Sequence, residues 1–160
     1  MISGRRTYRR HLPHFQSDFR TYFIFSTQNR WILPPSARAI AVRHIVFEDG
    51  RRVHLHAAVV MPDHVHILIT PMYDSAGHNY ALPTILQGIK GSSARSINKA
   101  LRRSGTVWQE ESFDHELRRD ESLRVKAAYL CANPVRKGLV ASIDDYPWLW
   151  REWIDRVRTA

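Results

Sequence analysis

The stretch "VVMPDHVHILIT" (residues 59–70) carries two histidines, one residue apart, in an apolar segment typical of a strand. Successive side chains of a strand point to opposite faces, so His64 and His66 project from one face and Val65 from the other. Two neutral imidazoles side by side can bind one divalent ion and leave coordination positions open. Spacing alone leaves two interpretations open: a metal site, or a chance pair of histidines in a strand.

The preceding segment, "VHLHAAVV" (residues 53–60), also reads as a strand, and we expect residues 61–63 to join the two segments in a hairpin. In that register Ala58 opposes His66, and its small side chain leaves room for an ion. A slip of one residue would reverse the faces, so the spacing does not settle the register.

A second pair of histidines tests how much the spacing means. His54 and His56 have the same separation, but they follow the turn "DGRR" at the outer end of the first hairpin strand. His64 and His66 lie next to the run Ile67–Ile69, which indicates a central strand. This context favours the second pair as metal ligands over the first.

The remaining elements alternate in a regular order. Short β-branched and aromatic runs predict strands, whereas Pro and Ser starts, Gly stops and helical spacing of apolar residues predict helices. The order is that of an α+β protein, a ferredoxin-like βαββαβ sandwich with an antiparallel sheet and an added C-terminal helix. The expected elements are a strand at 21–27, a helix within 34–50, the hairpin, a helix within 82–105, a strand at 106–112 ("TVWQEES"), and a last helix capped by Asp120 and ending near Ala132.

The last helix supplies a second candidate group. Leu123, Ala127 and Leu130 recur at helical spacing and form a buried stripe, and Tyr129 lies off this stripe. Asn133 shares the face of Tyr129, so its side-chain oxygen could complete a metal shell. The alternative, a packing tyrosine with a wet hydroxyl and an Asn-Pro helix stop, remains open from the sequence.

Charge points to the partner. Lys and Arg total 24 against 15 acidic residues in a chain of 160, a formal net charge of +9, and all but four of the 24 are Arg. The planar guanidinium binds phosphate oxygens with two hydrogen bonds, so this excess favours nucleic acid over an inert basic surface. The candidate phosphate contacts are Arg9, Arg10, Lys90, Arg95, Arg118, Arg119 and Arg136.

The composition also suggests a compartment and a domain count. Cys131 is the one cysteine, so no intramolecular disulfide can form, and no apolar run approaches the ~18 residues of a membrane span. We expect a soluble cytoplasmic protein with one domain over residues 1–160, including a basic N-terminal arm and a short C-terminal extension.

Four ordered motifs carry a resemblance to a known family. "VVMPDHVHILIT", "ILQGIKGSSARSIN", "VWQEESFDHELRRDESL" and "AAYLCANPVRKGLV" closely resemble the REP-associated tyrosine transposases. These are single-tyrosine HUH transposases that act on single-stranded DNA, and the resemblance covers roughly the whole chain. The turn before His64 carries Asp63, where Asn is more usual, and we interpret this carboxylate as a turn residue or an outer-shell partner of the metal.

The resemblance implies a function and a site. His64 and His66 would hold Mg²⁺ or Mn²⁺ with Asn133, and Tyr129 would attack a DNA strand to form a 5′-phosphotyrosine. The substrate would be a REP-like palindromic hairpin with a single-stranded tag, bound by a nucleoid-associated monomer or homodimer. Two rival functions stay open: a non-catalytic DNA- or RNA-hairpin-binding module, and a metal-dependent phosphoesterase that uses water.

Overall fold

An antiparallel sheet organises the computed structural model, which describes residues 19–118 and 121–152. Within these residues the sheet has five strands in the order β4-β1-β3-β2-β5. The strands are β1 (Thr21–Ser26), β2 (Val53–Val60), β3 (His64–Pro71), β4 (Phe113–Glu116) and β5 (Leu149–Arg151); the helices are α2 (Pro35–Phe47), α3 (Leu82–Leu101), α4 (Leu123–Cys131) and α5 (Asn133–Arg136), with 3₁₀ turns η1 (Gln28–Arg30) and η2 (Ile143–Asp145).

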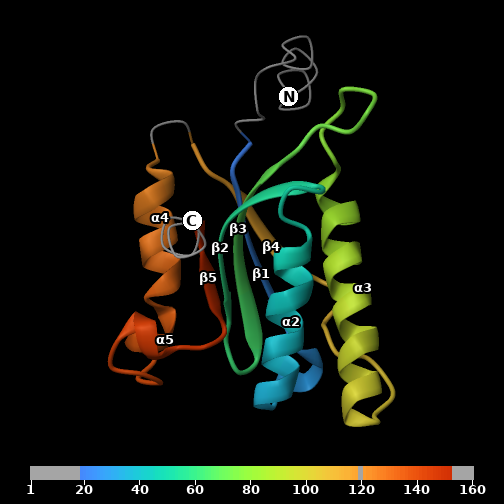
Figure 1. Cartoon of the computed structure of the whole chain (residues 1–160), viewed down its shortest axis with the longest axis vertical. Coiled ribbons are helices and arrows are strands. Elements are labelled where there is room, and N and C mark those ends of the chain that lie inside the picture. Colours follow the sequence, from blue (N-terminus) through green and yellow to red (C-terminus); the bar gives the residue numbers. More distant parts are fainter. Residues whose placement is uncertain (1–18, 119–120, 153–160) are drawn as a thin grey trace.

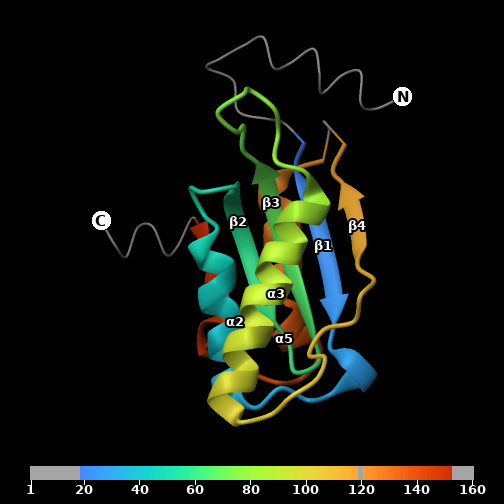
Figure 2. The same ribbon diagram turned by 90° about the vertical axis from the view of Figure 1, so that its right-hand side faces the viewer.

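The predicted ferredoxin-like sandwich is confirmed. Along the chain, β1, α2, β2, β3, α3 and β4 follow one another in the βαββαβ order. In the sheet these four strands are arranged β4-β1-β3-β2, and helices α2 and α3 lie together on one face (Figures 1 and 2). The main core fills this layer, with Phe23 and Phe25 of β1, Ile67 of β3, and Ile85 and Ile89 of α3 all buried. None of the helices in the described part of the chain is long and apolar enough to cross a membrane.

Helix α4 lies on the opposite face of the sheet (Figure 1). It packs Ala127 and Leu130 against Val59 of β2 and Leu68 of β3. Because side chains alternate along β3, the residues of even number, which include His64 and His66, share the face of Leu68. The predicted pairing of the two histidines on one face is therefore confirmed, and that face is the one that carries α4.

The predicted register of the hairpin is wrong by one residue. Val60 pairs with Val65 and Val59 pairs with His66, whereas Ala58 pairs with Ile67. Val60, Val65, Ala58 and Ile67 all belong to the core under α2 and α3. The observed register thus places side chains of the same face opposite each other, which the slipped register would not do.

The fourth strand lies later in the chain than the sequence suggests. Trp108 makes only an isolated bridge to Thr27, and its buried ring packs edge-on against Phe25 with a centroid distance of 5.0 Å. Its indole N–H donates to Ser93 Oγ at 2.9 Å. The β-forming residues of segment 106–112 are therefore used for packing, and the paired edge strand is the polar, mostly exposed β4.

Two further boundaries differ from expectation. Ser122 caps α4, its hydroxyl accepting a hydrogen bond from the Val125 N–H, while Asp120, the expected cap, lies outside the described residues. Strand β5 was not predicted from the sequence; it adds an edge to β2 through three pairs, Ala57–Arg151, Ala58–Trp150 and Val59–Leu149.

Candidate active site

His66 has one ring nitrogen held and the other without a partner. Its side chain is 7% exposed, and Nδ1 lies 2.6 Å from the phenol oxygen of Tyr22. Tyr22 pairs with Leu68 across β1 and β3, so its ring reaches the diagonal neighbour His66 and stacks on it at 7° between planes. Nε2 of His66 is buried and has no hydrogen-bond partner among the described residues. A buried nitrogen without a hydrogen-bond partner lowers the stability of the fold unless a bound ligand occupies it.

His64 has an equivalent support on its own side. Its Nδ1 is hydrogen-bonded to Asp63 Oδ1 at 2.8 Å, and the other carboxylate oxygen of Asp63 pairs with Arg30 at 2.9 Å. The two imidazole centroids are 4.8 Å apart. Metal-binding histidines typically have one ring nitrogen held by a carboxylate or another polar group, which orients the second nitrogen toward the ion. The interpretation of Asp63 as an outer-shell partner agrees with this geometry.

The electrostatics keep the ring of His66 neutral. Burial, followed by the charges of His64, Arg136 and Lys126, lowers the pKa of His66 to about 3. Burial, followed by repulsion from Tyr129, raises the pKa of Tyr22 to about 12, although Arg136 acts in the opposite direction. Tyr22 therefore stays a neutral phenol, and His66 keeps a lone pair available for a metal ion.

Tyr129 projects from α4 as the helical spacing predicts. Ala127 and Leu130 bury the other side of the helix, while Tyr129 is 58% exposed. Two cations lie on its ring: Lys126 Nζ is 5.6 Å and Arg136 Cζ is 4.0 Å from the ring centroid. Lys126 also lies 4.5 Å above the ring of Tyr22, which connects the tyrosine helix to the histidine pair.

Asn133 sits one turn beyond Tyr129 and is nearly buried, at 8% exposure. Its Nδ2 donates to Leu130 O at 3.0 Å and its Oδ1 accepts from Arg136 Nη2 at 2.8 Å. Arg136 also donates from Nη1 to the main-chain oxygen of Tyr129 at 2.8 Å. The amide oxygen has a second lone pair, so it could bind an ion while it still accepts the hydrogen bond from Arg136.

The basic residues singled out from the sequence are not gathered at one place. Lys90 donates to the main-chain oxygens of Gln109 and Glu110 and to Ser112 Oγ, so it holds the segment before β4. Arg95 lines a groove of about 480 Å³ between α2 and α3, on the face away from Tyr129. Arg118 and Arg136 are the other described candidates, and of these four Arg136 alone contacts Tyr129; Arg9, Arg10 and Arg119 lie outside the described residues.

Tyr22 is the site residue that the sequence does not reveal. It occurs in an aromatic strand, "TYFIFS", where alternating side chains suggest packing and nothing else. Its hydroxyl meets His66 across 44 residues of chain, and no local pattern records that contact.

Comparison with known proteins identifies the family of the chain. The profile of the family described as "Transposase IS200 like" matches residues 16–130. A protein of Haemophilus influenzae named as a REP-associated tyrosine transposase is 29% identical over 102 residues, which is 58% of this chain and only 55% of that relative. The REP-associated tyrosine transposase of Escherichia coli K12 is 24% identical over 147 residues, covering 82% of this chain and 81% of the relative.

A solved structure shares the fold. The structure of a REP-associated tyrosine transposase bound to a REP hairpin superposes with a TM-score of 0.63 at 21% identity, over 85% of this chain and 79% of that chain. The resemblance read from the sequence motifs is thus confirmed. The matched profile spans most of the chain, and the chain belongs to the IS200-like transposases, a family of enzymes that cut and transfer DNA.

Proposed function

We propose that this chain cleaves and rejoins single-stranded DNA at REP-like hairpins, with Tyr129 as the nucleophile. The observation that carries the proposal is the histidine pair. His64 and His66 each have Nδ1 held by a neighbour, and the buried Nε2 of His66 faces the side of the sheet that carries the tyrosine helix. A REP hairpin is bound in the solved structure of the relative, and the names of the two curated relatives describe them as REP-associated.

A divalent ion fits this donor set. His64 and His66 would hold it through Nε2, and the oxygen of Asn133 would be the third ligand from the chain. Mg²⁺ or Mn²⁺ would serve, with imidazole ligands favouring Mn²⁺ in binding strength. When bound, the ion would polarise the scissile phosphate and fix its orientation.

The chain's own groups account for the covalent step. The phenol oxygen of Tyr129 forms a bond to phosphorus and loses its proton, the bond from phosphorus to the 3′ oxygen breaks, and that oxygen takes up a proton. The products are a 5′-phosphotyrosine and a free 3′-OH, and the reverse attack by a 3′-OH rejoins or transfers the strand. Arg136 holds the helix end, and Lys126 Nζ lies 5.6 Å from the ring centroid of Tyr129, where its positive charge would stabilise the phenolate.

Binding of the hairpin would rest on arginine contacts to phosphate. Arg136 and Arg118 are the described candidates near α4, and Arg9, Arg10 and Arg119 remain candidates from the sequence. Lys90 is a poor choice because the chain itself occupies its ammonium group. Arg95 would contact only a DNA strand that passes over the face of α2 and α3. Both a monomer and a homodimer are compatible with this site.

The test is a denaturing gel with a labelled single-stranded hairpin oligonucleotide and Mn²⁺. We expect a shifted covalent band that requires metal and disappears in Tyr129→Phe and in His64→Ala. Tyr80→Phe is the matched control, because Tyr80 packs against the core of the other face. Cleaved DNA without an adduct would identify water as nucleophile, and binding without cleavage would leave a hairpin-binding module; either result would refute the proposal.

A further inference from the structure

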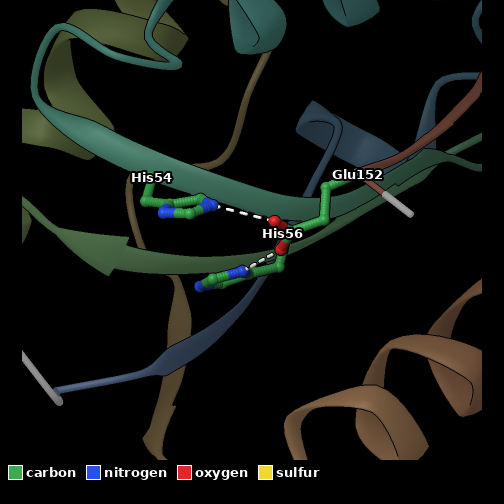
Figure 3. Close-up of side chains that lie close together, drawn as sticks. All are labelled: His54, His56 and Glu152. Carbon is green, nitrogen blue, oxygen red and sulfur yellow. Dashed lines mark hydrogen bonds and ion pairs between the residues drawn. The ribbon is translucent and has the colours of Figure 1, made fainter. Parts of the chain in front are cut away.

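A second cluster of metal-ligating side chains lies at the β2–β5 edge of the sheet. His54 Nε2 is 2.9 Å from Glu152 Oε1, and His56 Nδ1 is hydrogen-bonded to Glu152 Oε2. Figure 3 shows both imidazoles turned toward the one carboxylate. One ligand atom from each of the three residues can be chosen so that all lie within 4.8 Å of one another.

A β-bulge brings the two histidines together. His54 pairs with Thr70 and Leu55 pairs with Ile69, but the next pair is Ala57–Leu68, so His56 is the extra residue. The main-chain N–H of Leu55 donates to Asp49 Oδ1 at 2.8 Å, which holds the strand at the irregularity. The imidazoles consequently stack, with centroids 4.5 Å apart. Bulges commonly re-aim side chains next to functional sites.

The third ligand arrives through the pairing of β5. Arg151 pairs with Ala57, so the following residue, Glu152, reaches the position of the bulged His56. The carboxylate is 12% exposed, and both of its oxygens face ring nitrogens. Residues nearly one hundred positions apart are thus joined at a site that is largely shielded from solvent.

The protonation states suit a cation. Burial lowers the pKa of His56 despite the opposing effect of Glu152, and His56 Nε2 is hydrogen-bonded to Thr70 Oγ1 at 2.7 Å. Burial raises the pKa of Glu152, but the hydrogen bonds to His56 and His54 outweigh it and lower that pKa. The cluster therefore combines the neutral imidazole of His56 with an ionised carboxylate, and the hydroxyl group of Thr70 supports that ring from behind, as in established metal sites.

This cluster is separate from the tyrosine site. Thr70, which supports His56, lies four residues beyond His66 on the same strand, about 13 Å away at a rise of about 3.3 Å per residue. Two ions that act together on one phosphate are about 3.5–4 Å apart, so the two sites cannot share a reacting group.

We propose that His54, His56 and Glu152 form a site for Zn²⁺, independent of the ion proposed at His64 and His66. Two imidazoles and one carboxylate suit zinc far better than Mg²⁺, and they leave a fourth position for water. Tetrahedral zinc with ligand bonds of about 2.0–2.1 Å separates donor atoms by about 3.3 Å. Both histidine–Glu152 contacts therefore have to open, the His54 contact by a few tenths of an ångström and the shorter His56 contact by more. The ion would fasten the end of β5 to the bulge of β2.

The experiment is a calorimetric titration with Zn²⁺, using the full chain in a His64→Ala/His66→Ala background that removes the other candidate ligands. We expect one bound zinc, and an affinity that falls tenfold or more on adding Glu152→Gln or His54→Ala. Glu121→Gln is the matched control, a carboxylate that pairs with His115 away from the cluster. With Co²⁺ as probe, visible bands of a four-coordinate ion should appear in the background protein and vanish in the same two variants.

The design separates this proposal from the proposed function, because it needs neither DNA nor cleavage. Glu152→Gln keeps the size of the side chain and one accepting oxygen, and His54 is the more exposed histidine, so both variants should fold. Absence of zinc binding in the background protein, or zinc binding that persists in both variants, would overturn the site and leave a cluster held by hydrogen bonds and an ion pair alone.

Discussion

Replacing Tyr22 with Phe tests whether the histidine pair is supported for metal binding. The substitution keeps the ring that stacks on His66 and removes only the hydroxyl that lies 2.6 Å from Nδ1. Both side chains are buried, at 9% and 7% exposure, so water cannot replace the lost partner without a change in packing. The variant therefore leaves His66 with neither ring nitrogen held by a residue of the described ranges.

Two magnitudes follow. A buried polar group left without its partner costs about 1–3 kcal/mol in the free energy of unfolding, and in a protein of this size each kcal/mol lowers the melting temperature by roughly 2–4 °C. Loss of a partner that orients a metal-binding histidine weakens metal binding by about 10–100-fold. The second effect is specific to a metal site, whereas the first would follow from any buried hydrogen bond.

The assay measures the Mn²⁺ concentration for half-maximal cleavage of the hairpin oligonucleotide, beside thermal unfolding in EDTA. Tyr146→Phe is the matched control: Tyr146 is buried, and its hydroxyl donates to Val60 O at 2.6 Å. We expect both variants to lose stability and only Tyr22→Phe to need more Mn²⁺. An unchanged Mn²⁺ requirement in Tyr22→Phe, or an equal increase in both variants, would refute the role of Tyr22 in orienting His66.

Three other outcomes are expected. Arg136→Ala removes the hydrogen bonds to Tyr129 O and Asn133 Oδ1 and should slow single-turnover cleavage at least tenfold; an unchanged rate would show that Arg136 does not position the nucleophile. Lys90→Ala should lower the free energy of unfolding in urea by about 2 kcal/mol, because a charged donor is lost, with hairpin affinity unchanged; weaker binding at full stability would restore Lys90 as a DNA contact. Hairpin affinity should fall about tenfold or more between 50 and 200 mM salt, and a flat response would argue against phosphate contacts.

Much of the site could be predicted because its residues follow local periods. The alternation of a strand places His64 and His66 on one face, and the helical period places Tyr129 off the buried stripe of α4. These statements need only the neighbouring residues, and the structure bears them out. The βαββαβ order is local in the same sense, since each element is marked by its own apolar pattern and by Pro, Gly or Ser at its ends.

The hairpin register and the edge strands depend on what lies across the sheet. Val60 pairs with Val65 because both enter the core under α2 and α3, and the turn sequence does not record that choice. Trp108 has the residue type of a strand, yet the space beside Phe25 and Ser93 takes it out of the ladder. Strand β4 is mostly polar, and strand β5 has only three residues, so neither carries a pattern long enough to predict a strand.

The sequence by itself determined the order of the elements, the face of the histidine pair and the exposure of the tyrosine, because each follows from patterns among neighbouring residues, with periods of two residues in a strand and about 3.6 in a helix. The tertiary structure alone decided that Tyr22 would hold His66 across 44 residues of chain and that Glu152 would meet His54 across 98. Such contacts form only when the sheet is assembled in one register. The spacing of each histidine pair is therefore visible in the sequence, but the partner that completes each site is not.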